Sequence, residues 1–149
     1  MHILDVITII SAGLMTGTEL AVSAFVNPAL QRLERGPQAQ AVAIFARSLG
    51  RAMPVWYVSC FALLLVELFL HRHQGVFIPF VAATAIWALV ILFSIAVLVP
   101  INNHIIASLS AAVPAVGWER ELRKWELLHR VRILLLIVAL FVFINAVVA

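Results

Sequence analysis

Four long apolar runs, separated by short polar segments, make up most of the sequence. They cover residues 3–26, 55–70, 76–101 and 131–149. A helix needs about 20 residues to cross about 30 Å of hydrocarbon, and most of the runs are long enough. Apolar and polar residues do not alternate at period two, as the strands of a membrane barrel would. The pattern predicts an all-α integral membrane four-helix bundle in a single transmembrane domain of residues 1–149, with helices over residues 3–28, 53–71, 76–101 and 118–148.

The segment between the first two predicted helices, residues 31–53, has a different pattern. A turn signal at Gly36-Pro37 is followed by apolar residues that recur between glutamines and arginines. This pattern predicts a short amphipathic helix at the cytoplasmic membrane surface, after which Met53-Pro54 opens the second membrane helix. Asn27-Pro28 would end or kink the first helix. Pro114 and Gly117 would interrupt helical structure between the third and fourth helices.

Composition and charge agree with a membrane protein. The chain is 64% hydrophobic and 11% charged, with a mean hydropathy of +1.11, which excludes an ordinary soluble domain. Of the ten Lys and Arg residues, all except Arg72 lie near residues 31–53 and 101–132. The positive-inside rule therefore places residues 31–53 and 101–125 in the cytoplasm and both termini outside, in what we expect to be a bacterial inner membrane. The basic residues then explain the topology, so the lipid bilayer is the expected partner and no nucleic acid is needed.

A polar stripe runs along the first predicted helix. Glu19, Ser23 and Asn27 are spaced by four residues and share a face, which Thr16 extends. A carboxylate within a membrane span is costly, so Glu19 should face the bundle interior and find a partner there. Gly13 and Gly17 have the small-xxx-small spacing that predicts a helix–helix contact. The run has Asp5 and no basic residue ahead of it, so we expect a membrane helix and not a cleaved signal peptide.

The entry to the fourth helix carries a second stripe. Trp118, Leu122, Trp125, His129 and Arg132 step by four, three, four and three, which places them on one helix face. On another face, two acid–base pairs at i,i+4 are expected to satisfy each other: Glu119 with Arg123, and Glu126 with Arg130. The partners of His129 and Arg132 must then come from other helices.

The predicted topology brings these groups to one membrane depth. The ends of helices one and three and the start of helix four meet at the cytoplasmic side, so we expect a pocket there with apolar walls and a few polar groups. Taken one at a time, each of these residues except Glu19 is explained by a plain structural role, such as capping a helix or reaching to the headgroups, whereas a carboxylate at the position of Glu19 favours a functional role. The candidate catalytic residues are Glu19, His129 and Arg132, and the candidate substrate-binding residues are Asn27, Asn102, Asn103 and Trp125.

A second polar cluster is predicted at the outer end. Glu67 and His71 are spaced i,i+4, which can hold a divalent metal, and His73, His2 and Asp5 lie near them in the topology. We favour a solvated turn without a metal and keep a site at Glu67, His71 and His73 as the weaker alternative. The single cysteine, Cys60, excludes an intrachain disulfide.

Three short stretches resemble one known family. They are Asn27-Pro28-Ala29-Leu30, Val99-Pro100-Ile101-Asn102-Asn103, and Trp125 followed by Leu128-His129 and Arg132. Together they are similar to the anthrone oxygenase-like family of small four-helix membrane proteins. A shifted alignment would put Arg130 in place of Arg132. For the characterised fungal members, the resemblance implies oxidation of an anthrone to an anthraquinone by O₂ without an obvious cofactor.

The predicted function is therefore a membrane oxygenase or oxidoreductase that takes a hydrophobic aromatic or quinol-like substrate from the lipid and uses no cofactor. Glu19 or His129 would deprotonate the substrate, and Arg132 with the asparagines would stabilise the oxyanion. The alternative is a non-catalytic protein that binds a lipid, a quinone or a haem, the last through His129 or His104. A subunit of a larger assembly, including a homo-oligomer, belongs to the same alternative.

Overall fold

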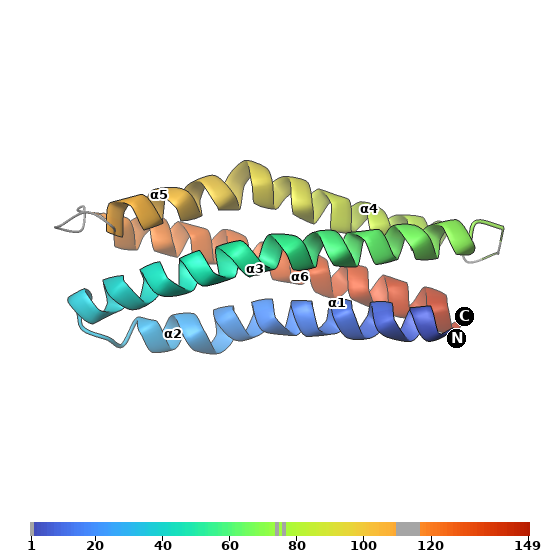
Figure 1. Cartoon of the computed structure of the whole chain (residues 1–149), viewed down its shortest axis with the longest axis horizontal. Helices are drawn as coiled ribbons and strands as arrows, with labels where there is room; N and C mark the ends of the chain where they lie inside the picture. Colours follow the sequence, from blue (N-terminus) through green and yellow to red (C-terminus); the bar gives the residue numbers. More distant parts are fainter. Residues whose placement is uncertain (1, 74, 76, 110–116) are drawn as a thin grey trace.

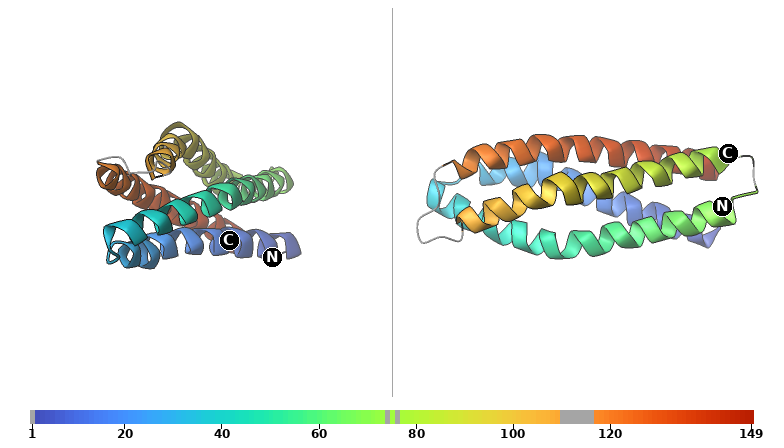
Figure 2. Two further views of the ribbon diagram at one scale, coloured as in Figure 1. Left: turned by 60° about the vertical axis from the view of Figure 1, so that its left-hand side comes forward. Right: turned by 90° about the horizontal axis from the view of Figure 1, so that it is seen from above.

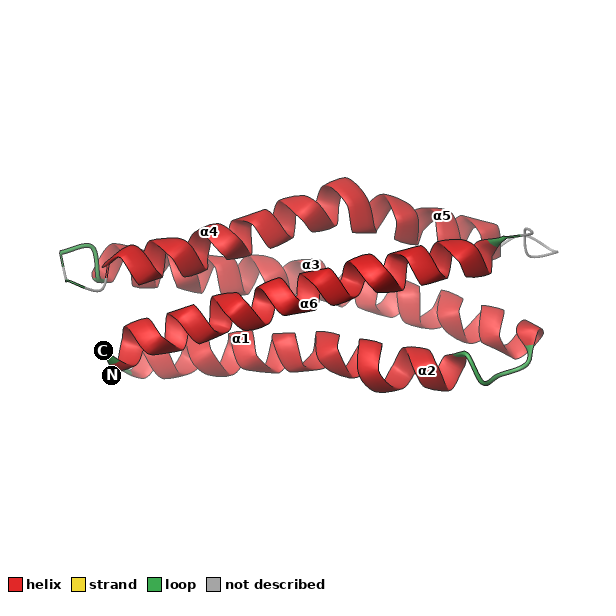
Figure 3. Ribbon diagram, turned by 180° about the vertical axis from the view of Figure 1, so that it is seen from behind, coloured by secondary structure: helices red, strands yellow, loops and turns green. Residues whose placement is uncertain are grey.

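The computed structural model describes residues 2–73, 75, 77–109 and 117–149, and over these ranges it contains helices and no strand (Figure 3). Four rods are formed, each long and apolar enough to cross a membrane. The predicted all-α membrane bundle is confirmed. Pro114 lies outside the described residues, whereas Gly117 directly precedes the last helix with φ 100°, a conformation that favours glycine. The rods are α1 (Ile3–Ala21), η1 (Val22–Val26) and α2 (Asn27–Leu30); α3 (Arg35–Leu70); α4 (Phe77–Phe93), η2 (Ser94–Leu98) and α5 (Val99–Leu109); and α6 (Trp118–Val148).

The rods run alternately up and down, and both chain termini lie at one end of the bundle (Figure 1). The turn between α3 and α4 is at that same end. The two views in Figure 2 show α6 running along the first and third rods, in agreement with its packing on α1, α4 and α5. α3 packs against α1, α4 and α5. Each rod therefore has neighbours on its inner side and leaves its outer side free.

Two apolar clusters hold the rods together. The larger one joins all four rods around fully buried side chains such as Met15, Trp87 and Leu136. The smaller one lies toward the α2–α5 end and consists of Ala39, Val42, Ile105 and Trp118 with their neighbours. Many large apolar side chains, from Ile3 to Val148, remain exposed along the outer faces. A soluble monomer rarely exposes so much apolar surface, and a bilayer would cover it.

The prediction of a separate amphipathic helix within residues 31–53 is wrong. α3 is one continuous helix of 36 residues that starts at Arg35 and passes through Pro54. Ala39 and Val42 pack in the smaller cluster, against α5 and α6, and this contact keeps the segment in line with the rod. At 1.5 Å per residue α3 is about 54 Å long, so the bundle extends well beyond a 30 Å hydrocarbon layer.

Two prolines widen their helices without ending them, which corrects the predicted end of helix three. Pro28 follows η1 and Pro100 follows η2, and both η segments are π-helical turns. Proline has no N–H to donate, and its ring collides with the carbonyl four residues back. The preceding residues accordingly reach five residues back: Asn27 N–H donates to the Val22 carbonyl, and Val99 N–H donates to the Ser94 carbonyl. The rods then continue as helices to Leu30 and Leu109.

The predicted packing role of Gly13 and Gly17 is also wrong. A Cβ atom added at either position would meet nothing within 4 Å, and Gly17 is exposed. The face of α1 that packs instead carries Ala12, Met15 and Thr16, all of which are buried. Adjacent residues on a helix differ by about 100° in direction, so the glycines point away from the contact that their neighbours make.

Candidate functional site

A cavity of about 210 Å³ lies in the α2–α5 half of the bundle. Its walls are mainly apolar side chains from all four rods, which suits a hydrophobic ligand. The polar groups on its walls are few: Glu19, Asn27, Tyr57, Ser94, Asn102, Trp125 and Arg132.

The cavity opens through the side of the bundle. The exposed residues of its lining include Phe45 and Val58 on α3, and Ile95 and Val99 at the η2–α5 junction. These exposed lining residues are all apolar and lie on α3 and the third rod, so we infer that the cavity opens between these two rods.

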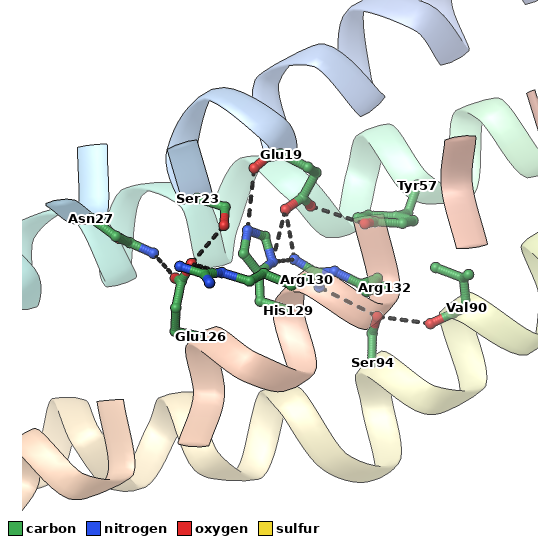
Figure 4. Close-up of polar contacts among 10 residues, drawn as sticks. All are labelled: Glu19, Ser23, Asn27, Tyr57, Val90, Ser94, Glu126, His129, Arg130 and Arg132. Atoms are coloured by element: carbon green, nitrogen blue, oxygen red, sulfur yellow. Dashed lines mark hydrogen bonds and ion pairs between the residues drawn. The ribbon is translucent and has the colours of Figure 1, made fainter. Parts of the chain in front are cut away.

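A buried ion pair forms the polar centre of the cavity (Figure 4). Arg132 Nη2 lies 2.6 Å from Glu19 Oε2, and the two residues are only 8% and 3% exposed. Tyr57 donates from its hydroxyl to the other carboxylate oxygen, Oε1, over 2.9 Å. Arg132 Nη1 donates to Ser94 Oγ over 3.3 Å, at the first residue of η2. Four rods thus each contribute one group to a single network.

His129 supports this ion pair from behind. It is 0% exposed and does not line the cavity. Its Nε2 lies 3.2 Å from the Glu19 backbone oxygen, and its Nδ1 lies 2.9 Å from Arg132 Nη2. These contacts fit a neutral ring in which Nε2–H donates to the carbonyl and Nδ1 accepts from the guanidinium. Trp125 stacks on the ring with centroids 4.6 Å apart, which fixes the orientation of His129.

A second buried carboxylate, Glu126, lies one helical turn before His129. It accepts from Ser23 Oγ over 2.5 Å, from Asn27 Nδ2, and from Arg130 Nε over 3.0 Å. The predicted Glu126–Arg130 pair is therefore present. The prediction that this pair lies on a face away from the site is wrong, because Glu126 is buried against η1.

The π turn explains why Ser23 and Asn27 reach the same partner. In a regular helix, positions four apart drift by about 40°. The wider η1 turn reverses this drift between Val22 and Val26, and both side chains meet Glu126. Glu119, the other acid of the expected pairs, contacts Arg35 of α3 at 2.9 Å.

The structure separates several neighbours that the sequence left equivalent. Asn102 lines the cavity, and its Nδ2 would lie 3.7 Å from a Cβ atom added at Gly50. Asn103 is exposed and does not line the cavity, so the predicted placement of Asn103 is wrong. Arg132 is inside the network, whereas the Arg130 side chain is exposed. His104, considered as a haem ligand, is exposed and pairs with Glu121 at 2.6 Å.

The family model described as anthrone oxygenase matches residues 41–142, which is more than half of the chain. The chain belongs to the anthrone oxygenase family. No curated protein and no solved structure matches it. The part of the chain that the family model matches contains Tyr57, Asn102, His129 and Arg132, whereas Glu19 lies on the first rod, before the matched part.

Three groups in the site of this anthrone oxygenase family member were missed by the sequence analysis: Tyr57, Ser94 and Glu126. Tyr57 is the only tyrosine and lies in an apolar run opposite Glu19, so its isolation was an available signal. Ser94 carried no signal of its own. Glu126 was hidden by its i,i+4 arginine, although Ser23 and Asn27 lacked any stated partner.

The second polar cluster lies at the other end of the bundle, away from the cavity. Glu67 and His71 are buried there, and Asp5 of α1 joins them. His73, which the sequence analysis grouped with them, is exposed and is not part of the cluster, and neither is the exposed His2 side chain.

Proposed function

We propose that this member of the anthrone oxygenase family oxidises a hydrophobic aromatic substrate with O₂ inside the membrane. The observation that carries the proposal is the buried Glu19–Arg132 pair on the wall of an apolar cavity that opens sideways. An ionisable pair at this depth is costly unless it has a use or a complete set of partners. Arg132 Nε is buried and has no hydrogen-bond partner among the described residues, so an acceptor oxygen on a ligand would complete it.

The substrate class that fits is a fused-ring phenol or anthrone with an activated methylene group. Glu19 would remove a proton from that methylene, and the negative charge would move onto the conjugated ring oxygen. Arg132 would stabilise this oxyanion through Nε–H, with Asn102 as a further donor on the wall. Tyr57 and His129 position the reacting pair: Tyr57 holds one oxygen of Glu19, and His129 holds Arg132.

The oxidation balances with O₂ alone. The substrate carbanion adds O₂ and takes up one proton to form a hydroperoxide at the same carbon. Loss of the second C–H proton breaks the O–O bond, leaves a carbonyl on the ring and releases the other oxygen as water. The methylene gives up four electrons, and both oxygen atoms of O₂ accept them. Glu19 relays both protons in this scheme.

The proposal is tested with the purified chain in lipid nanodiscs supplied with a hydroxyanthrone. We expect one molecule of quinone, measured by its absorbance, to form for each molecule of O₂ that is consumed. Glu19→Gln keeps the shape of the side chain and removes the base, so kcat should fall by about 10²–10⁴-fold. Full turnover by Glu19→Gln would exclude Glu19 as the base.

A matched pair of variants separates use of the cavity from general damage. Ala46→Phe would fill the cavity, whereas Ala52→Phe adds the same ring on the exposed side of α3. We expect only the first to abolish substrate binding. Saturable binding by the wild-type protein without any turnover would favour the non-catalytic alternative, a membrane protein that binds a lipid or a quinone.

A further inference from the structure

Three potential metal ligands from two helices meet at the end of the bundle opposite the cavity. Asp5 lies in the first turn of α1, and Glu67 and His71 lie at the end of α3. One ligand atom from each residue lies within 4.8 Å of the other two. Asp5 is 14 residues before Glu19, which corresponds to about 21 Å along α1, so this cluster is separate from the candidate oxygenase site.

The two carboxylates are buried without a cation. Asp5 is 2% exposed and Glu67 is 0% exposed. In the described part of the chain, neither forms an ion pair with Lys or Arg, and the one ion-pair contact is His71 Nδ1 to Glu67 Oε2 at 3.6 Å. Arg72, the nearest arginine in sequence, lies over the Phe69 ring. Two acids at this spacing repel each other unless they share a proton or a cation lies between them.

The hydrogen bonds leave one oxygen of each acid without a partner. Thr8 Oγ1 donates to Glu67 Oε1 over 3.1 Å, and the His2 backbone N–H donates to Asp5 Oδ2. The remaining oxygens, Asp5 Oδ1 and Glu67 Oε2, are buried and have no hydrogen-bond partner among the described residues. Donors that hold one oxygen and leave the other bare are the usual second layer around a metal ligand.

The imidazole of His71 is also held in place. Its Nδ1 lies 2.9 Å from the Glu67 backbone oxygen, and its ring stacks on Phe80 at 4.4 Å. In a tetrahedral site with bonds of about 2.0–2.2 Å, two ligand atoms lie about 3.3–3.6 Å apart, so atoms that lie within 4.8 Å of one another can reach one ion after side-chain rotations. An imidazole together with carboxylates favours a first-row transition ion over Mg²⁺ or Ca²⁺.

We infer that Asp5, Glu67 and His71 bind a divalent first-row transition metal ion such as Zn²⁺, and that the ion joins the start of α1 to the end of α3. The ion cancels the charge of the two carboxylates. It also ties two helices together where the chain begins.

The test uses the full chain purified in detergent with a tag that contains no histidine, stripped with a chelator and titrated with Zn²⁺ alone. We expect uptake on the order of one ion per chain, a higher melting temperature, and no comparable effect from Mg²⁺. Glu67→Gln should abolish uptake. Thr8→Val, which removes only the orienting donor, should weaken Zn²⁺ binding by about 10–100-fold.

His73→Ala is the matched control, because it removes an exposed histidine two residues beyond His71. It should bind Zn²⁺ as the wild type does. Should Glu67→Gln fail to fold, His71→Gln gives the same comparison in a chain that keeps both acids. No uptake by the wild-type protein, or equal uptake by the ligand variants, would overturn the inference and leave the acids sharing a proton.

Discussion

At the residue scale, both members of the buried Glu19–Arg132 ion pair also form hydrogen bonds to neighbouring side chains. Arg132 bonds Glu19, His129 and Ser94, and Glu19 also accepts from Tyr57. Removal of one member of a buried pair leaves an uncompensated charge, whereas removal of both often costs little. The destabilisation that follows a substitution at this pair therefore depends on whether its partner remains charged.

Arg132→Met should lower the free energy of unfolding by about 3–5 kcal/mol, because Glu19 keeps its charge without its main partner. The double variant Glu19→Gln/Arg132→Met should recover a large part of that loss. Unfolding titrations in mixed detergent micelles measure both values. Losses that simply add in the double variant would mean that the two side chains do not interact.

A single hydroxyl can be tested in the same network. Tyr57→Phe removes the donor to Glu19 Oε1 and keeps the ring, which packs in the larger apolar cluster. A net hydrogen bond contributes about 0.5–1.5 kcal/mol, and we expect a loss near the upper end because the acceptor is ionised. The measurement is the same unfolding titration, and an unchanged stability would show that Tyr57 does not hold the carboxylate.

At the element scale, the two π turns aim the polar groups. η1 lies between Glu19 and Asn27, and η2 begins at Ser94. Each is followed by a proline that takes away one regular helical hydrogen bond. Turns of this kind are frequent at functional sites, since the extra residue changes the direction of the side chains that follow.

Pro100→Ala should let the third rod return to a regular helix. Stability should stay equal or increase, because proline is costly within a helix, while turnover should fall by up to about 100-fold as Ser94 and Asn102 shift. Pro79→Ala is the matched control, since Pro79 lies in the first turn of α4. The melting temperature and kcat of both variants are measured together. An unchanged kcat in Pro100→Ala would show that the π turn does not position Ser94 and Asn102 for turnover.

The sequence predicted the rods, and it predicted that Glu19 faces the bundle interior and finds a partner there, because both follow from the cost of polar groups in hydrocarbon. It did not name Arg132 as that partner. It did not predict which of Asn102 and Asn103 faces inward, because that depends on the rotation that η2 introduces. It also ended helix three near Pro100 and started helix two at Met53. A local rule about proline was applied there, and tertiary packing outweighed it.

At the scale of the whole molecule, all the basic residues except Arg72 lie in the half of the bundle away from the termini. Both termini share one end of the bundle with the α3–α4 turn, which carries Arg72, and the remaining basic residues lie in the other half (Figure 1). The positive-inside rule then predicts both termini outside. A C-terminal alkaline phosphatase fusion should be active and a C-terminal green fluorescent protein fusion dark. The opposite result would invert the topology.

The proposed opening between α3 and the η2–α5 junction also predicts which measure of substrate concentration governs binding. In the proposed function, a substrate that enters between Val58 and Ile95 would come from the hydrocarbon, so its binding would depend on its mole fraction in the bilayer. Adding empty lipid vesicles to an assay at fixed total substrate would dilute the substrate in two dimensions. The apparent KM in molar units should rise in proportion to added lipid, while the same KM expressed per lipid molecule stays constant. A cavity filled from water would respond to dilution of the buffer instead.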